Sequence, residues 1–375
     1  MKKVLIVFGT RPEAIKMAPV VKAFQQSDVF NTKVCVTAQH REMLDQVLDF
    51  FNITPDFDLD LMKPNQTLEQ LTSNILLNIK AVFEEFKPDY VFVHGDTSTT
   101  FVASLAAFYQ RIKVCHVEAG LRTFDMAHPF PEEANRSLTG VLTHFHFAPT
   151  EKAKQNLLQE NVADSQILVT GNTVIDSLLD SVDKLNNKDS AAITHLKKAI
   201  NWENISNNKI ILVTGHRREN FGDGFLNICY ALKELAKHKD CTIIYPVHLN
   251  PNVQKPVFEI LENVKNIQLI DPLPYEKFIW LLDKSYLVIT DSGGIQEEAP
   301  SLGKPVLVMR EKTERPEAVD AGTVILVGTN KNKIVEEANT LITNKEAYLK
   351  MSKTHNPYGD GSAAQRIVEF LEKHG

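Results

Sequence analysis

The stretch Asp291–Glu298 combines residue types that can bind a diphosphate. It follows an apolar, β-branched run at Tyr286–Thr290, which predicts a buried parallel strand. The turn that comes next contains Ser292, Gly293 and Gly294, and its glycines can take positive φ and let the backbone approach a ligand closely. A short helix is predicted directly after this turn. Free N–H groups and the helix dipole at such a start attract phosphate oxygens.

Glu298 lies about one turn inside that predicted helix. A carboxylate at this position suits a ribose diol better than a phosphate, so the stretch indicates a nucleotide. The alternative is an ordinary strand and helix in which Ser292 caps the helix. A GxGxxG motif after the first predicted strand and a GxxxxGK[ST] motif are both absent, which argues against NAD and P-loop ATP chemistry. The nucleotide is therefore predicted to be a substrate, with no cofactor.

Ionisable side chains follow several predicted strands of the first half. Arg11, His40, Asp96 and Glu118 each come just after a short apolar run. Because ligands in open α/β sheets bind at the carboxyl ends of the strands, four such residues suggest one wall of an active site. Asp96 could instead cap the helix that follows it.

Two cations lie near the start of the first predicted helix, which runs to about Gln26. Thr10 and Glu13 have the spacing of a capping box there. The helix dipole disfavours Arg11 and Lys16 at this end, so either they extend to solvent or an anion binds beside them. The position of Arg11 in the turn favours the anion.

The second half contains another polar loop after a predicted strand. This loop, TGHRREN, begins at Thr214 and could hold phosphate through its backbone and arginines. His216 in this loop could also be an ordinary loop histidine that bonds to the backbone. Glu132 begins a predicted helix, a position that the dipole favours for a carboxylate in any protein.

Strands and helices alternate along the whole chain, so the fold class predicted is α/β, with two doubly wound, Rossmann-like domains that face each other across a cleft. The expected first domain is 1–170, joined by the last helix at 359–375. The expected second domain, which would bind the nucleotide, is 171–358. The turn cluster at Pro357–Gly361 would carry the chain between them.

Composition narrows the class of protein further. The 375 residues suggest two to three domains, and 43% hydrophobic residues suffice for real cores. A net charge of −6 argues against a nucleic-acid-binding protein. No run approaches the ~18 apolar residues of a membrane span, and the apolar run after Met1 is too short for a signal peptide. Four scattered cysteines without metal spacing predict reduced thiols, a cytoplasmic location and no metal site.

Seven motifs in order along the chain resemble the non-hydrolysing UDP-N-acetylglucosamine 2-epimerase family. They are spread along most of the chain: FGTRPEAIKMAP (8–19), HGDTSTT (94–100), HVEAGLRT (116–123), PFPEEANR (129–136), TGHRREN (214–220), YPVHLNP (245–251) and DSGGIQEEAPSLGKPV (291–306). The resemblance implies an isomerase with a GT-B-like fold, substrate in the interdomain cleft, a homodimer, and a product that feeds cell-surface polysaccharide. UDP-N-acetylglucosamine and UDP are the partners that it implies.

The family reaction is an interconversion of UDP-N-acetylglucosamine and UDP-N-acetylmannosamine. The C2 proton has no adjacent carbonyl, so direct abstraction would be very slow. Loss of UDP from C1 makes this proton removable and yields a 2-acetamidoglucal, to which UDP then adds again. Such a route needs acid and base groups near C2 and cations around the diphosphate.

The resemblance also implies roles for particular residues. The acid/base set near C2 would be Asp96, Glu118 and Glu132, with His216 assisting at the diphosphate and in proton transfer. Substrate binding would fall to Arg11, Lys16, Phe278, Ser292, Gly293, Gly294 and Glu298. A second UDP-N-acetylglucosamine that activates some bacterial members would lie near Gln39, Glu42, Arg217 and His248. Which carboxylate removes the C2 proton and which returns it stays open.

Two other functions fit parts of the pattern. A glycosyltransferase of the same fold shares the nucleotide-binding turn but needs an acceptor surface, and the carboxylates predicted near the sugar argue against it. A non-catalytic nucleotide-sugar sensor would not need Asp96, Glu118 and Glu132 together.

Overall fold

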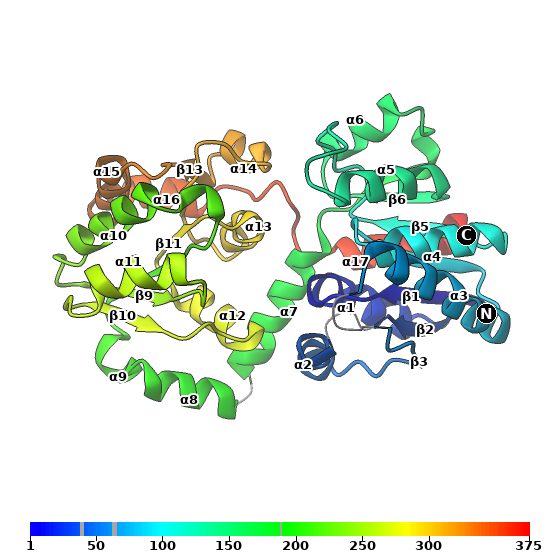
Figure 1. Cartoon of the computed structure of the whole chain (residues 1–375), viewed down its shortest axis with the longest axis horizontal. Coiled ribbons are helices and arrows are strands. Elements are labelled where there is room, and N and C mark those ends of the chain that lie inside the picture. The colour runs from blue at the N-terminus through cyan, green and yellow to red at the C-terminus, as the bar shows by residue number, and fades with distance from the viewer. Residues whose placement is uncertain (38–40, 62–65, 188–189) are drawn as a thin grey trace. The chain divides into compact units, whose positions relative to one another are not determined.

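The structure is a computed structural model that describes residues 1–375 apart from 38–40, 62–65 and 188–189, and it leaves the side chains of residues 41 and 42 undescribed. The chain forms two compact units, one of Met1–Ser177 with Tyr358–Gly375 and the other of Leu178–Pro357 (Figure 1). Each unit is a parallel sheet flanked by helices. The predicted α/β class with two doubly wound halves is therefore confirmed.

The first unit contains a seven-stranded sheet of order β3-β2-β1-β4-β5-β6-β7. Its elements are β1 (Lys2–Phe8), α1 (Arg11–Gln26), β2 (Phe30–Val36), α2 (Arg41–Phe51), β3 (Phe57–Asp58), α3 (Leu68–Phe86), β4 (Tyr90–His94), α4 (Ser98–Tyr109), β5 (Lys113–Val117), α5 (Glu132–Leu142), β6 (Phe145–Ala148), α6 (Glu151–Gln159), the 3₁₀ helix η1 (Asp164–Gln166), β7 (Ile167–Val169) and α17 (Ala363–His374). Helix α7 (Thr173–Asn187) begins in this unit and ends in the next.

The second unit contains a six-stranded sheet of order β10-β9-β8-β11-β12-β13. Its elements are α8 (Ala191–Ala199), α9 (Trp202–Ile205), β8 (Lys209–Thr214), the 3₁₀ helix η2 (Arg218–Asn220), α10 (Asp223–Leu235), β9 (Cys241–Pro246), α11 (Pro251–Leu261), β10 (Ile267–Ile270), α12 (Tyr275–Lys284), β11 (Leu287–Thr290), α13 (Gly293–Ser301), β12 (Val306–Val308), α14 (Pro316–Ala321), β13 (Val324–Leu326), α15 (Lys331–Thr343) and α16 (Lys345–Ser352).

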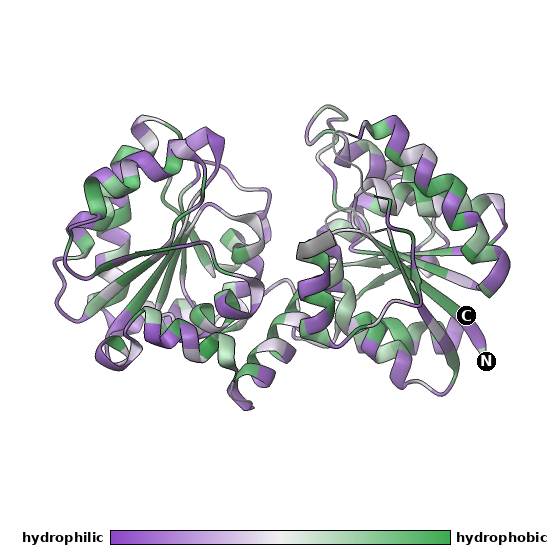
Figure 2. Cartoon of the chain, turned by 60° about the horizontal axis from the view of Figure 1, so that its bottom comes forward, coloured by the Kyte–Doolittle hydropathy of each residue, from purple (hydrophilic) through white to green (hydrophobic). Residues whose placement is uncertain are grey.

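Strands form the apolar interior of each unit. Neighbouring strands pair in parallel, as in the register Leu5 with Lys33 on one side of β1 and with Val91 on the other. Buried β-branched side chains such as Val7 and Val213 fill the sheets because both faces are covered by helices. Figure 2 shows the strands as mostly hydrophobic and the outer helix faces as hydrophilic. The buried strands position the polar residues that follow them.

Each sheet has one point where the chain order reverses. In the first sheet this point lies between β1 and β4, and in the second it lies between β8 and β11. Strand-end loops diverge there toward opposite faces of the sheet, and ligands of doubly wound folds bind at such a place.

The capping box predicted at the start of α1 is confirmed, and it does more than cap the helix. Thr10 Oγ1 accepts from the Glu13 backbone N–H, and Glu13 Oε2 accepts from the backbone N–H groups of Gly9 and Thr10. The other carboxylate oxygen accepts the hydroxyl protons of Thr97 (2.6 Å) and Thr100 (3.1 Å). Buried Glu13 thus joins the loops after β1 and β4 at the point of reversal.

In the described part of the chain, no helix is both long and apolar enough to cross a membrane, and no group of His, Cys, Asp and Glu side chains could hold a metal ion. The four cysteines are free and buried.

Gly120 offers a test of how tightly the loop after β5 is packed. Its φ is +89°, and a Cβ there would lie 2.3 Å from the Ala153 carbonyl oxygen. Gly120→Ala should therefore cost about 1–2 kcal/mol for the left-handed backbone and a further 1–3 kcal/mol, roughly, for overpacking. The loss of stability should appear as a lower Tm of Gly120→Ala than of the wild type, measured by calorimetry.

Gly322→Ala is the matched control, because Gly322 has φ +76° but open space where a Cβ would lie. The Gly322→Ala variant should lose only the stability that the left-handed backbone costs, without the further loss from overpacking. Equal decreases in Tm for the two variants would contradict the steric account.

Candidate functional site

Carboxylates and cations of the first unit gather at the carboxyl ends of β4 and β5. Asp96 follows β4, and Glu118 follows β5. Lys16 reaches Glu118 from α1, and Arg136 reaches Asp96 from α5. Because β4 adjoins the point of reversal in the sheet, this cluster occupies the place where doubly wound folds bind ligands.

Glu118 is held in a strained and strongly polar position. Its Oε2 accepts from Lys16 Nζ (2.5 Å) and from Asn172 Nδ2 (2.8 Å), and lies 3.7 Å from His94 Nε2. Burial by itself would raise the pKa of Glu118, but Lys16 and His94 outweigh it and hold the pKa well below its ordinary value. Its φ of 62° is left-handed, a conformation that costs a non-glycine residue about 1–3 kcal/mol and persists where the surroundings impose it.

The pKa of Asp96 is shifted in the opposite direction to that of Glu118. Burial raises the pKa of its carboxyl above the ordinary value, and the Arg136 guanidinium, which donates to Oδ2, reduces this rise. Asn135 Nδ2 donates to the Asp96 carbonyl oxygen at 3.0 Å. The cap of α4 is Thr97, so the interpretation of Asp96 as a helix cap is wrong. Two carboxylates with pKa values shifted apart are the pattern of an acid and a base.

Glu132 and Arg11 are the first residues of α5 and α1, and both are half-buried. Among the described residues, neither side chain has a hydrogen bond or an ion pair. Glu132 lies four residues before Arg136, so the two share one face of α5. That face also carries the guanidinium that binds Asp96.

The second unit has its own polar cluster at the carboxyl ends of β8, β9 and β11. A cavity of about 380 Å³ lies there. The residues that line it are His216, Arg217, Arg218, His248, Asn250, Ser292 and Gly293. The rings of His216 and His248 stack with centroids 5.3 Å apart. Three of the sequence-predicted binding stretches therefore meet at one cavity.

Asp291 holds this cluster together from beneath. It is fully buried, and its Oδ2 accepts from the backbone N–H groups of His216 and Arg217, both at 2.9 Å, and from Asn220 Nδ2 at 3.2 Å. Arg217 Nε also donates to the Asp291 carbonyl oxygen at 2.9 Å. This single carboxylate fixes the loop after β8 to the end of β11.

Gly293 and Gly294 do not form the turn with positive φ that the sequence predicts. The helix α13 begins at Gly293, and neither glycine has positive φ. Gly293 instead provides space, because a Cβ there would lie 2.9 Å from Glu314 Oε1. Ser292 occupies the cap position but makes no side-chain cap hydrogen bond, so its interpretation as a capping side chain is wrong.

The Glu314 carboxylate therefore lies beside the start of α13. Its Oε1 accepts from Arg217 Nη2 at 2.9 Å, and its Oε2 accepts from Arg310 Nη1. Burial alone would raise the pKa of Glu314, but backbone and Arg310 hydrogen bonds lower it below the ordinary value. An anionic group between two arginines at a helix start shows that this place accommodates anions.

Two further predicted substrate-binding residues, Glu298 and Phe278, lie on helices of the second unit. Glu298 lies on α13, with its Oε1 3.3 Å from the position of a Cβ on Gly294. Phe278 is half-buried on α12. His40 and Gln39 lie outside the described residues, and so does the side chain of Glu42.

Sequence interpretation missed several residues of both clusters. His94 and Arg136 were not assigned roles, and Asp291 was treated only as part of a turn. Arg136 follows Glu132 by four residues, a signal that could have been used. The contact between Asp291 and His216 joins positions 75 residues apart, so no local pattern reveals it.

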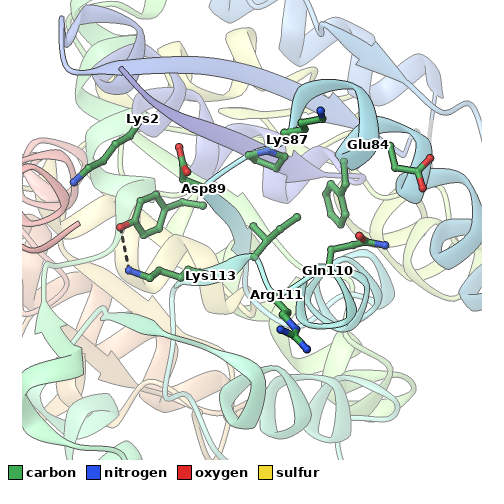
Figure 3. Close-up of a pocket in the computed structure, with 11 residues that line it drawn as sticks. Lys2, Glu84, Lys87, Asp89, Gln110, Arg111 and Lys113 are labelled. Atoms are coloured by element: carbon green, nitrogen blue, oxygen red, sulfur yellow. Dashed lines mark hydrogen bonds between the residues drawn. The ribbon is translucent and has the colours of Figure 1, made fainter.

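A larger cavity, of about 630 Å³, lies at the opposite end of the strands of the first sheet, around the amino ends of β1, β4 and β5. Figure 3 shows Lys2, Lys87, Arg111 and Lys113 around it, with Asp89 and Glu84 among them. None of the predicted site residues lines this cavity. Its mixed charges, far from the carboxyl ends of the strands, identify it as a surface recess and not the candidate site.

Comparisons with known proteins identify the family of the chain. The family model "UDP-N-acetylglucosamine 2-epimerase" matches residues 22–372. The chain belongs to the UDP-N-acetylglucosamine 2-epimerase family. Its similarity to individual members of the family covers whole chains. The UDP-N-acetylglucosamine 2-epimerase of Escherichia coli O157:H7 is 60% identical over 374 residues, which is 99% of each protein.

Solved structures of this epimerase family show the same fold. The enzyme from Neisseria meningitidis, crystallised with UDP-GlcNAc, is 55% identical with a TM-score of 0.86 over 99% of this chain and 100% of that one. The enzyme from Methanocaldococcus jannaschii, in complex with UDP-GlcNAc and UDP, is 34% identical with a TM-score of 0.77 over 100% of both chains.

The ion pair between Lys16 and Glu118 should stabilise the first unit in a pH-dependent way. The folded-state pKa of Glu118 is depressed, so its contribution is present above the unfolded pKa and is lost as pH falls through the folded pKa. Lys16→Met leaves a buried carboxylate without its cation and should cost about 3–5 kcal/mol at neutral pH. The cost should shrink in acid, where Glu118 of the variant takes up a proton. Urea unfolding at several pH values measures it.

Lys80→Met is the matched control, because Lys80 pairs with Glu84 at 3.5 Å on an exposed helix face. It should cost under about 0.5 kcal/mol. A pH-independent loss in Lys16→Met would contradict the electrostatic account.

Proposed function

We propose that the chain interconverts UDP-N-acetylglucosamine and UDP-N-acetylmannosamine by reversible inversion at C2 of the sugar. The observation that carries this proposal is the carboxylate pair Asp96 and Glu118, whose pKa values are shifted in opposite directions within one cluster. A nucleotide-binding module without a reaction to catalyse has no need for such a pair. Membership of the epimerase family supplies the substrate class.

The proposed route is elimination of UDP followed by its re-addition. The C1–O bond breaks, its electrons leave with the diphosphate, and a base removes the C2 proton, which leaves a C1–C2 double bond in a 2-acetamidoglucal. UDP then attacks C1 while an acid protonates C2 from the other face. Atoms and charge balance without an external reductant or oxidant, so no cofactor is required.

The electrostatics favour a division of labour between the two carboxylates. Glu118, kept ionised by Lys16, suits the base that removes the proton. Asp96, whose raised pKa favours the protonated form, suits the acid that returns it. The roles exchange in the reverse direction, and Glu132 completes the acid/base set. Arg11 and Lys16 would also offset negative charge on the sugar or phosphates.

The second unit would hold the nucleotide. The start of α13, with Ser292, Gly293 and Gly294, would bind the diphosphate. Glu298 would bind the ribose, and Phe278 would lie near the uracil. His216, at the cavity beside Ser292, would assist departure of the diphosphate and transfer a proton. A diphosphate there would compete with the Glu314 carboxylate for Arg217.

Finer features of the proposal follow from the family. We infer a non-hydrolysing, cytoplasmic enzyme that acts as a homodimer and supplies N-acetylmannosamine for cell-surface polysaccharide. A second UDP-N-acetylglucosamine would activate it through Gln39, Glu42, Arg217 and His248. Arg217 and His248 line the same cavity as His216, which supports a regulatory molecule close to the diphosphate.

Proton NMR of the purified chain with UDP-N-acetylglucosamine in D₂O tests the reaction. UDP-N-acetylmannosamine should appear, with deuterium at C2 of both sugars, because C2–H cleavage is reversible. Asp96→Asn, Glu118→Gln and Glu132→Gln should each lower kcat by about 10²–10⁴-fold. The exposed Glu84→Gln should keep full activity. Substrate that stays unchanged and protonated at C2 would indicate a transferase or a sensor instead.

The elimination route predicts escape of its intermediate. In Asp96→Asn, protonation of C2 should slow while the loss of UDP continues, so free UDP and 2-acetamidoglucal should accumulate over hours. Chromatography of the quenched reaction detects both. If neither Asp96→Asn nor the other two carboxylate variants released any glucal, the route would need revision.

A further inference from the structure

Asp291 has one carboxylate oxygen with no structural use in the described part of the chain. Oδ2 accepts three N–H donors, but Oδ1 is buried and makes no hydrogen bond there. Among the described residues, the ionisable side chain in ion-pair range of Oδ1 is that of His216, whose Nδ1 lies 3.5 Å away. A buried carboxylate oxygen without a hydrogen-bond partner destabilises the folded chain, so a retained one suggests a function.

The side chain of His216 lies next to this unpartnered oxygen. The side chain of His216 is 49% exposed, whereas Asp291 is fixed by three donors. A distance of 3.5 Å is slightly too long for a hydrogen bond, and a small rotation of the imidazole closes it. The stacked ring of His248 limits the other motions of that imidazole. Nδ1 faces the buried carboxylate, which leaves Nε2 for a ligand in the cavity.

We propose that Asp291 is a positioning residue for His216, and that its Oδ1 accepts the Nδ1–H of the imidazole when a UDP moiety occupies the cavity. The contact selects the tautomer in which Nδ1 carries the proton, and it orients Nε2 toward the diphosphate. It also stabilises the imidazolium that forms when Nε2 takes a proton. This inference rests on the proposed function, which gives His216 a proton to transfer.

The substitution Asp291→Asn separates this role from a purely structural one. The amide oxygen can accept the three N–H donors that Oδ2 accepts now, so the loop stays in place. The amide NH₂ then faces His216 and donates to Nδ1, which forces the proton to Nε2. The tautomer should therefore reverse while the fold is kept.

The experiment uses the full chain labelled with ¹⁵N at histidine and saturated with UDP. Long-range ¹H–¹⁵N spectra distinguish the two tautomers, and His216→Gln assigns the signals. The wild type should show Nδ1–H at His216, and Asp291→Asn should show Nε2–H. An Nε2–H tautomer in the wild-type complex overturns the proposal, whether or not the variant folds.

Kinetics provide the second readout. Asp291→Asn should lower kcat by about 10²–10⁴-fold with a change in KM of only a few-fold, because the tautomer matters in the reacting complex. Combined with His216→Gln it should cost nothing further, since both changes remove the same function. Independent, additive losses would show that Asp291 acts elsewhere and would overturn the proposal.

Asn220→Ala is the matched control for a structural role. It removes one donor to Oδ2 and a hydrogen bond to the Met309 carbonyl oxygen, and leaves Oδ1 unchanged. It should lower Tm but keep the wild-type tautomer. Failure of the proposed function has a different signature: a wild type without epimerase activity whose His216 tautomer still reverses in Asp291→Asn.

Discussion

A buried carboxylate at the point of chain reversal organises each unit. In the first, Glu13 accepts N–H groups from the loop after β1 and hydroxyls from the start of α4. In the second, Asp291 accepts N–H groups from the loop after β8. Adjacent parallel strands send their loops in opposite directions at these points, and backbone N–H groups there lack partners. One acceptor-only side chain satisfies several of them and joins loops that are distant in sequence.

Rigid loops make opposite pKa shifts possible within one cluster. Glu118 and Asp96 follow neighbouring strands, β5 and β4, yet Glu118 has Lys16 as its main cation whereas Asp96 has Arg136. Both carboxylates are partly withdrawn from water, so burial by itself would raise the pKa of each. The net direction then depends on how close and how well placed each cation is. Glu118 has left-handed backbone, and Gly120, two residues later, packs closely against Ala153 of α6.

Local sequence patterns sufficed for the elements but not for the contacts between them. Apolar runs located the strands, and the spacing of Thr10 and Glu13 located the start of α1, because both depend on neighbours in the chain. The conformation of Gly293 was predicted wrongly, since the reason for a glycine there is the carboxylate of Glu314, 21 positions later. The role of Asp291 was missed for the same reason.

The position of Glu314 explains why a glycine occurs at position 293. A DSGG turn suggests backbone that bends sharply, yet here the helix simply begins at Gly293, and the missing side chain leaves room for an anionic group. Arg217 and Arg310 supply the positive charge, and in a chain with a net charge of −6 such a concentration of cations must be local. A carboxylate has two oxygens in one plane and a single charge, whereas a diphosphate has more of both. A diphosphate at this place would therefore offer the same arginines and helix start more acceptor oxygens than Glu314 does.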